Sequence, residues 1–174
     1  MSAPAIVLIG PMGAGKTSVG RRVARTLELP FADTDKLVVR DHGPIPELFV
    51  RYGESHFRRL ERAAVQEALA TAGVVALGGG AVLDPHTQEE LRDHRVVLLT
   101  VQPHIVASRI GRDDRPLLAG ENPVDRWNRI LDERLPLYER LADIVFDTSS
   151  GPLADIVTHI VDWARHDAAA REHT

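Results

Sequence analysis

The chain has 174 residues, of which 44% are hydrophobic and 26% are charged, and its formal net charge is -4. This composition is typical of a soluble globular protein of one domain, and the negative charge argues against a nucleic-acid-binding surface. No apolar run approaches the roughly 20 residues that a membrane span needs, and the N-terminus lacks a signal-peptide pattern, so we expect a cytoplasmic protein without a membrane partner. The absence of cysteine excludes disulfides, thiolate metal sites and cysteine nucleophiles.

Residues 10–17 match the phosphate-binding P-loop pattern G-x-x-x-x-G-K-[ST], between an apolar run and a helix-like pattern. Its glycines allow a tight turn that brings backbone N–H groups close to phosphate oxygens, and Lys16 adds a positive charge. The following helix directs its positive end at the same phosphates, and the Thr17 hydroxyl is placed to hold Mg²⁺. A chance glycine-rich turn is the alternative, which the flanking strand and helix patterns disfavour. The loop alone does not distinguish a kinase from another NTPase or a nucleotide-gated switch.

Short apolar runs of strand length alternate with helical patterns along the chain. The strand candidates are residues 5–9, 74–77, 96–101 and 144–146, with a weaker one at 30–32. Apolar stripes at helical spacing are formed by Val19, Val23 and Leu27 and by Leu153, Ile156, Ile160 and Trp163. This alternation predicts β-α-β units around a parallel sheet. We expect one domain over residues 1–164, with a mobile lid at about 111–123 and a disordered tail at 165–174.

Asp33 and Asp35 follow the weaker strand candidate, at the end of the sheet where ligands bind in open α/β folds. Two carboxylates there suit a metal ion and an acceptor hydroxyl separately. The alternative is a turn and an N-cap for the helical pattern that starts near Lys36. The P-loop favours the functional interpretation, because a kinase needs an acidic partner for its metal and a group that orients its nucleophile.

Phe57, Arg58 and Glu61 lie on a helical stretch that begins near Glu54. Arg58 and Glu61 are three residues apart, so they share a helix face and can pair. The simplest interpretation is an exposed ion pair worth about 0–1 kcal/mol. The alternative is that Glu61 holds the guanidinium of Arg58 so that it can bind a carboxylate with two hydrogen bonds.

Gly78, Gly79 and Gly80 follow another strand candidate, again at a carboxyl end of the predicted sheet. They either form a tight turn or allow backbone N–H groups to approach a ligand closely, and the P-loop favours the second interpretation.

Four arginines concentrate positive charge in the expected lid and near it: Arg109, Arg112, Arg115 and Arg134. Most arginines in such a stretch are solvated. Arg115 is the most distinctive, because the rigid apolar sequence P-L-L at 116–118 follows it. A charged tip before such a hinge suits a segment that folds over a phosphoryl group.

In register, these motifs resemble those of the shikimate kinase family. After the P-loop come D-T-D at 33–35, G-E-x-x-F-R-x-x-E at 53–61, G-G-G at 78–80, R-P-L-L at 115–118 and R-x-P-L-Y at 134–138. Each motif beyond the P-loop is weak alone, but the ordered set is highly specific and spans about residues 5 to 160.

The resemblance implies a three-layer P-loop kinase fold of the α/β class, with a central parallel sheet flanked by helices and a lid segment. It implies transfer of the ATP γ-phosphate to the 3-hydroxyl of shikimate, in the chorismate route to aromatic amino acids. ATP would be the co-substrate and Mg²⁺ the metal ion. The partners would be small molecules only, and the enzyme would act as a monomer.

The resemblance also implies a role for each matched residue, with Lys16, Asp35 and Arg115 as the catalytic groups. Asp35 would orient the reacting hydroxyl, and Arg115 would meet the transferring phosphate. Mg²⁺ would be held by Thr17 and, through water, by Asp33. The remaining nucleotide-binding residues would be Gly13, Ala14, Gly15, Ser18 and, against the adenine, Arg109. The acceptor site would comprise a carboxylate clamp of Arg58 and Arg134, a wall of Phe49 and Phe57, and Glu61, Gly78, Gly79 and Gly80.

Two segments depart from the family pattern. Residues 43–46 are one residue shorter and carry an extra proline, so the helix on the acceptor side is expected to start differently. Residues 149–151 lack a basic residue that some relatives have near the adenine. Another small-metabolite kinase, such as a gluconate kinase, is the alternative enzyme. A nucleotide-gated switch is disfavoured, because no N-K-x-D segment is present to bind guanine.

Overall fold

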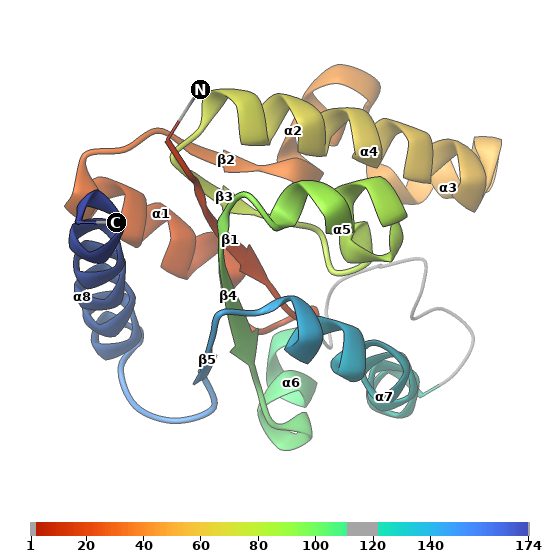
Figure 1. Cartoon of the computed structure of the whole chain (residues 1–174). Coiled ribbons are helices and arrows are strands. Elements are labelled where there is room, and N and C mark those ends of the chain that lie inside the picture. The colour runs from red at the N-terminus through yellow and green to blue at the C-terminus, as the bar shows by residue number, and fades with distance from the viewer. Residues whose placement is uncertain (1–2, 111–121, 174) are drawn as a thin grey trace.

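Five parallel strands form the centre of the molecule, and helices cover both faces of the sheet (Figure 1). A computed structural model describes residues 3–110 and 122–173 of the chain. The strands are β1 (Ile6–Ile9), β2 (Phe31–Asp33), β3 (Val74–Ala76), β4 (Arg95–Thr100) and β5 (Ile144–Asp147), in the order β2-β3-β1-β4-β5. Every neighbouring pair is parallel. The prediction of five strands in a parallel α/β fold is confirmed, and each strand boundary lies within one residue of its predicted position.

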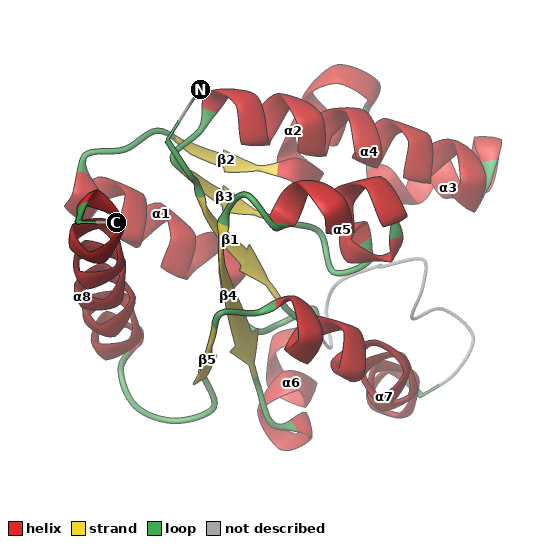
Figure 2. Ribbon diagram, viewed as in Figure 1, coloured by secondary structure: helices red, strands yellow, loops and turns green. Residues whose placement is uncertain are grey.

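The helices divide between the two faces of the sheet (Figure 2). They are α1 (Lys16–Leu27), α2 (Thr34–His42), α3 (Ile45–Tyr52), α4 (Glu54–Thr71), the 3₁₀ turn η1 (Ala81–Leu83), α5 (Pro85–Leu91), α6 (Pro103–Ile110), α7 (Pro123–Leu141) and α8 (Leu153–Glu172). Successive residues of β1 point to opposite faces, so Ile6 and Leu8 pack with α1 and α8 while Val7 and Ile9 pack with α4 and α5. Both faces are apolar, as buried parallel strands require.

A third, smaller core joins α2, α3 and α4 on the β2 side of the sheet. It consists of Val38, Leu48, Phe57 and Ala64, all buried. The extra proline of this region, Pro46, falls in the first turn of α3. A missing N–H costs little there, because the first turn of a helix has no intrahelical acceptor for it. The apolar contacts of the small core hold α3 and α4 in fixed positions beside the sheet.

Helix α8 is longer than predicted, and most of the predicted lid lies outside the described residues. Residues 165–172, predicted to be a disordered tail, continue α8 to Glu172. Three consecutive alanines at 168–170 favour a helix, and Arg171 Nε pairs with Asp167 Oδ2 at 2.8 Å, one turn away. Residues 111–121 of the predicted lid lie outside the described residues, while Asn122 caps α7 and Pro123 begins it.

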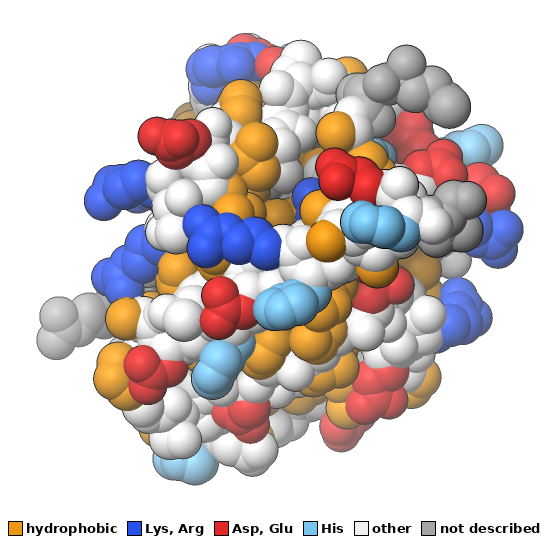
Figure 3. All heavy atoms as spheres, turned by 60° about the vertical axis from the view of Figure 1, so that its left-hand side comes forward, with side chains coloured by type: hydrophobic (Ala, Val, Ile, Leu, Met, Phe, Trp, Pro, Cys, Tyr) orange, Lys and Arg blue, Asp and Glu red, His pale blue; other side chains and the backbone are white. Residues whose placement is uncertain are grey.

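The side chains on the face in Figure 3 and the character of the helices agree with the mixed composition of the chain. On the face seen in Figure 3, acidic and basic side chains are interspersed with histidines and apolar atoms. None of the helices within residues 3–110 and 122–173 combines the length and the apolar character that crossing a membrane requires.

His94 gives the fold a pH-dependent contact. Its Nδ1 accepts a hydrogen bond from the backbone N–H of Ala5 at 3.0 Å, which requires a neutral ring, and burial lowers the pKa of His94 below its ordinary value of 6.5. A lowered folded-state pKa gives stability that is present above pH 6.5 and is lost as pH falls. We expect His94→Asn, whose amide oxygen can replace Nδ1, to make the decrease in unfolding free energy between pH 7.5 and 5 smaller, because the ring that titrates is removed. Denaturant titrations at both pH values check this, and an unchanged pH dependence would contradict it.

Candidate active site

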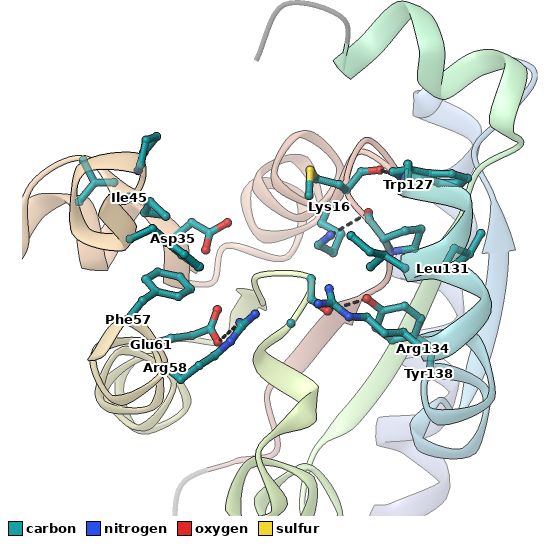
Figure 4. A pocket seen from close by; sticks show the side chains of 18 of the residues that line it. Lys16, Asp35, Ile45, Phe57, Arg58, Glu61, Trp127, Leu131, Arg134 and Tyr138 are labelled. Atoms are coloured by element: carbon teal, nitrogen blue, oxygen red, sulfur yellow. Dashed lines mark hydrogen bonds and ion pairs between the residues drawn. The ribbon is translucent and has the colours of Figure 1, made fainter. Parts of the chain in front are cut away.

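A cavity of about 450 Å³ opens beside the P-loop, between α2–α4 on one side and α7 on the other (Figure 4). It lies at the carboxyl ends of the strands, where ligands bind in α/β sheets. Polar and charged groups from four segments line it, together with apolar side chains: Lys16, Asp35, Phe49, Phe57, Arg58, Glu61, Gly79, Gly80, Trp127, Arg134 and Tyr138. The sequence analysis assigned all of these except Trp127 and Tyr138 to the site.

The P-loop follows β1 in a conformation that only glycine permits at its first position. Gly10 has a φ of 140°, and a Cβ on it would lie 2.2 Å from the carbonyl oxygen of Leu99. At the other end Gly15, with a φ of 88°, precedes α1 and provides no side-chain cap. The first N–H groups of α1 therefore face the loop without a capping side chain, as an anion site at a helix N-terminus requires.

Lys16 extends from the first turn of α1 toward the cavity (Figure 4). Its ammonium group donates hydrogen bonds to the carbonyl oxygens of Gly10 at 2.7 Å and Pro11 at 3.0 Å. Ser18, which the sequence analysis placed with the phosphate-binding residues, is exposed in the same turn.

Asp33 has the capping role that one of its two interpretations predicted, and it also contacts the P-loop. Its Oδ1 accepts a hydrogen bond from the N–H of Lys36 at 3.1 Å and so caps α2, while its Oδ2 accepts one from the Thr17 hydroxyl at 2.5 Å. Asp35 lies in the first turn of α2 and its carboxylate points into the cavity (Figure 4). One helix start thus brings one carboxylate to the P-loop threonine and another to the cavity.

Arg58 and Glu61 do not form the exposed ion pair that was the simplest prediction. Arg58 Nη1 lies 2.7 Å from Glu61 Oε1, and the side chain of Glu61 is only 4% exposed. Burial raises the pKa of Glu61, and the charge and hydrogen bond of Arg58 oppose this shift. Burial lowers the pKa of Arg58, but its interactions with Glu61 and Glu54 together outweigh burial and the net shift is upward. Arg58 also pairs with Glu54 at 3.3 Å. The guanidinium is therefore held from two sides at the cavity wall.

The three glycines make room for these charged groups. A Cβ on Gly78 would lie 2.6 Å from Asp35 Oδ1 and 2.9 Å from Glu61 Oε2, and a Cβ on Gly80 would lie 2.4 Å from Arg58 Nη1. They also form a turn, since the N–H of Ala81 donates to the carbonyl of Gly78 at 3.0 Å. Neither of the two roles predicted for these glycines, a tight turn or close approach to a ligand, included making room for charged side chains.

Helix α7 supplies the opposite wall. Arg134 points into the cavity, and the hydroxyl of Tyr138, one turn on, donates to the carbonyl oxygen of Gly79 at 2.5 Å (Figure 4). Burial raises the pKa of Tyr138, so the phenol stays protonated and able to donate. No role was predicted for Trp127, nor for Tyr138, which ends the motif at 134–138. The signal was available, because positions 127, 131, 134 and 138 share one helix face.

The structure describes some of the remaining predicted site residues and not others. The rings of Phe49 and Phe57 are in contact, with centroids 4.8 Å apart, and both border the cavity. Arg109 donates to the carbonyl oxygens of Gly13 at 2.6 Å and Thr148 at 3.2 Å, which places it between the P-loop and the segment after β5. Arg112 and Arg115 lie outside the described residues.

Comparison with known proteins decides the family. The sequence model of the shikimate kinase family matches residues 12–165. The chain belongs to the shikimate kinase family. It is 50% identical to a shikimate kinase of Thermobifida fusca over 151 residues, covering 85% of this chain and 87% of that protein. It is 44% identical to one of Rhodococcus erythropolis over 161 residues, covering 91% and 95%.

A solved member of the family has the same structure. The shikimate kinase from Acinetobacter baumannii in complex with shikimate superposes with a TM-score of 0.90 at 36% identity, over 95% of both chains. The family prediction from the motifs is thereby confirmed, and so is the expected kinase class of the enzyme.

Proposed function

We propose that this cavity is where the chain transfers the γ-phosphate of ATP to the 3-hydroxyl of shikimate. The observation that carries the proposal is the arrangement of the cavity walls. Lys16 and the P-loop stand at one wall, and Asp35, Arg58 and Arg134 surround the remaining space. A phosphate-binding loop suits a triphosphate donor, and a pocket with two arginines and two carboxylates, of which Glu61 is paired with Arg58, suits a small hydroxylated carboxylate acceptor.

On the donor side, the uncapped start of α1 and the N–H groups of residues 13–18 would hold the ATP phosphates. The Thr17 hydroxyl and the Asp33 carboxylate are hard oxygen ligands in direct contact, which fits Mg²⁺. Within the described ranges, no cluster of three His, Cys, Asp or Glu side chains is present. Mg²⁺ would be bound mainly by phosphates and waters, with Asp33 acting through water. When bound, the ion would neutralise charge on the phosphate oxygens.

On the acceptor side, Arg58 and Arg134 would bind the carboxylate of shikimate from opposite walls of the cavity. Asp35 would accept a hydrogen bond from the reacting hydroxyl and direct its oxygen at the phosphorus. Phe49 and Phe57 would cover the apolar face of the ring. The reaction needs positioning and charge neutralisation more than covalent chemistry, so these fixed contacts account for most of the expected catalysis.

The remaining assignments belong to the same proposal. Arg115 would meet the transferring phosphate when the segment that carries it closes, and Arg109 would leave the Gly13 carbonyl to lie against the adenine. The proposal includes a monomeric enzyme, as the family resemblance implies.

A coupled assay of ADP release tests the proposal directly. We expect release to depend on shikimate and on Mg²⁺, with gluconate giving no more than the background rate. Equal or faster release with gluconate would support the alternative kinase instead.

Gly80→Ala should reduce shikimate affinity by displacing Arg58. Its Cβ would displace the Arg58 guanidinium, the far end of a flexible side chain, and its φ of -97° suits alanine. A displacement of this size predicts a rise in the KM for shikimate of about tenfold to a hundredfold. Because Arg58 Nη1 also pairs with buried Glu61, we expect Tm to fall, but by no more than in Arg58→Ala.

The control for Gly80→Ala uses the Arg58→Ala background. If Gly80 acts by giving room to Arg58, the second substitution adds nothing to the KM of the Arg58→Ala variant. Full additivity in steady-state kinetics would refute this role of Gly80.

A further inference from the structure

Three consecutive carbonyl oxygens of the P-loop each accept a hydrogen bond from a side chain outside the loop. The donors come from three different elements and bond at 2.6 to 2.8 Å: Trp127 Nε1 of α7 to Met12, Arg109 Nη1 of α6 to Gly13, and the Thr148 hydroxyl after β5 to Ala14. None of these contacts belongs to the phosphate-binding motif itself.

These contacts fix the direction of the loop's N–H groups. In a planar trans peptide, the C=O of one residue and the N–H of the next point in opposite directions. Holding the carbonyls of Met12 and Ala14 toward Trp127 and Thr148 therefore directs the N–H groups of Gly13 and Gly15 to the side that faces away from these two residues. That is the side from which a phosphate would be bound.

Trp127 differs from Arg109 and Thr148 because its helix, α7, also carries residues on the acceptor side of the cavity. The same face of α7 carries Arg134 at the cavity and Tyr138, whose hydroxyl bonds the Gly79 carbonyl. One rigid helix thus contacts both the donor loop and the acceptor side of the cavity. The indole is 2% exposed, and its N–H is its only hydrogen-bonding group, so the bond to Met12 is strongly specified.

We infer that Trp127 is a positioning residue, which holds the P-loop in register with the acceptor groups of α7 through the Met12 carbonyl. The inference rests on the proposed function for its acceptor half. Its donor half concerns only nucleotide binding, which can be measured without any acceptor.

The test is Trp127→Phe, which removes the donor and keeps an aromatic ring. We expect about a tenfold loss in ADP affinity by calorimetry and a similar fall in kcat, as one lost hydrogen bond predicts, with the KM for shikimate within twofold. Trp163→Phe is the matched control, because Trp163 packs against the same core cluster from α8. It should lose comparable stability in denaturant titrations yet keep ADP affinity and kcat.

Fluorescence gives a second readout that does not require Trp127→Phe to fold. The chain has two tryptophans, so in Trp163→Phe all indole emission comes from Trp127. We expect saturating ADP to change its intensity or wavelength, because the nucleotide would occupy the loop that the indole contacts.

The outcomes separate the inference from the proposed function. Unchanged ADP affinity and kcat in Trp127→Phe, equal losses in Trp163→Phe, or emission that is insensitive to ADP would each overturn the role of Trp127. A parent enzyme that binds ADP but shows no shikimate-dependent turnover would instead refute the proposed function. It would not contradict the role of Trp127 in holding the P-loop.

Discussion

Lys16→Ala is expected to lower kcat by about 10²–10³-fold, the usual cost of losing one fixed group that stabilises transition-state charge. Lys16 stands at the start of α1 and faces the cavity, where its ammonium now bonds the carbonyls of Gly10 and Pro11. Phosphate oxygens carry full charge, so they would compete successfully with these neutral carbonyls for the ammonium. Steady-state kinetics measure the fall in kcat, and calorimetry with shikimate alone should give nearly the parental affinity.

Lys36→Ala is the matched control for Lys16→Ala. It removes the same charge from an exposed position of α2, where the capping bond to Asp33 comes from the backbone N–H and survives the substitution. Parental turnover in Lys36→Ala would show that general charge is not the cause. Parental turnover in Lys16→Ala would remove Lys16 from the mechanism.

Local patterns were sufficient to predict the sheet and much of the cavity. The run at 6–9 is apolar at every position, which only a strand buried on both faces explains well, and the glycines and lysine that follow it have fixed roles in a P-loop. Asp33 shows the limit of such patterns. Its sequence suggested either a helix cap or a partner of the metal site. The structure shows the cap through one carboxylate oxygen, the other oxygen bonds the Thr17 hydroxyl, and the role at the metal site stays a prediction.

What the sequence could not supply are contacts between segments far apart in the chain. Trp127 bonds a residue 115 positions away, and Thr148 bonds one 134 positions away. The burial of Glu61 likewise depends on the packing of α4 against the glycine turn, which helix periodicity does not reveal. The last turns of α8 were missed for the opposite reason, because their polar composition was given more weight than the helix propensity of alanine.

Arg58→Ala is expected to weaken shikimate binding by about 2–5 kcal/mol, the usual cost of truncating one partner of an enclosed charge pair. The substitution also affects the stability of the fold, and this effect must be separated from the loss of shikimate affinity. Glu61 would be left with a buried charge and without its 2.7 Å partner, so the fold is also destabilised. Burial already raises the pKa of Glu61, and losing Arg58 raises it further.

The sign of that pKa shift gives a way to separate the two effects. A raised folded-state pKa costs stability only above the ordinary value of 4.5, so the stability deficit of Arg58→Ala should shrink as pH falls toward that value. The double variant Arg58→Ala with Glu61→Gln carries no buried charge at position 61, and we expect it to recover most of the lost unfolding free energy at pH 7.5 but none of the shikimate affinity. Denaturant titration and calorimetry on both variants measure the two quantities independently. If the double variant regained affinity together with stability, Arg58 would act through the fold alone, and the second carboxylate ligand would have to come from a group other than its guanidinium.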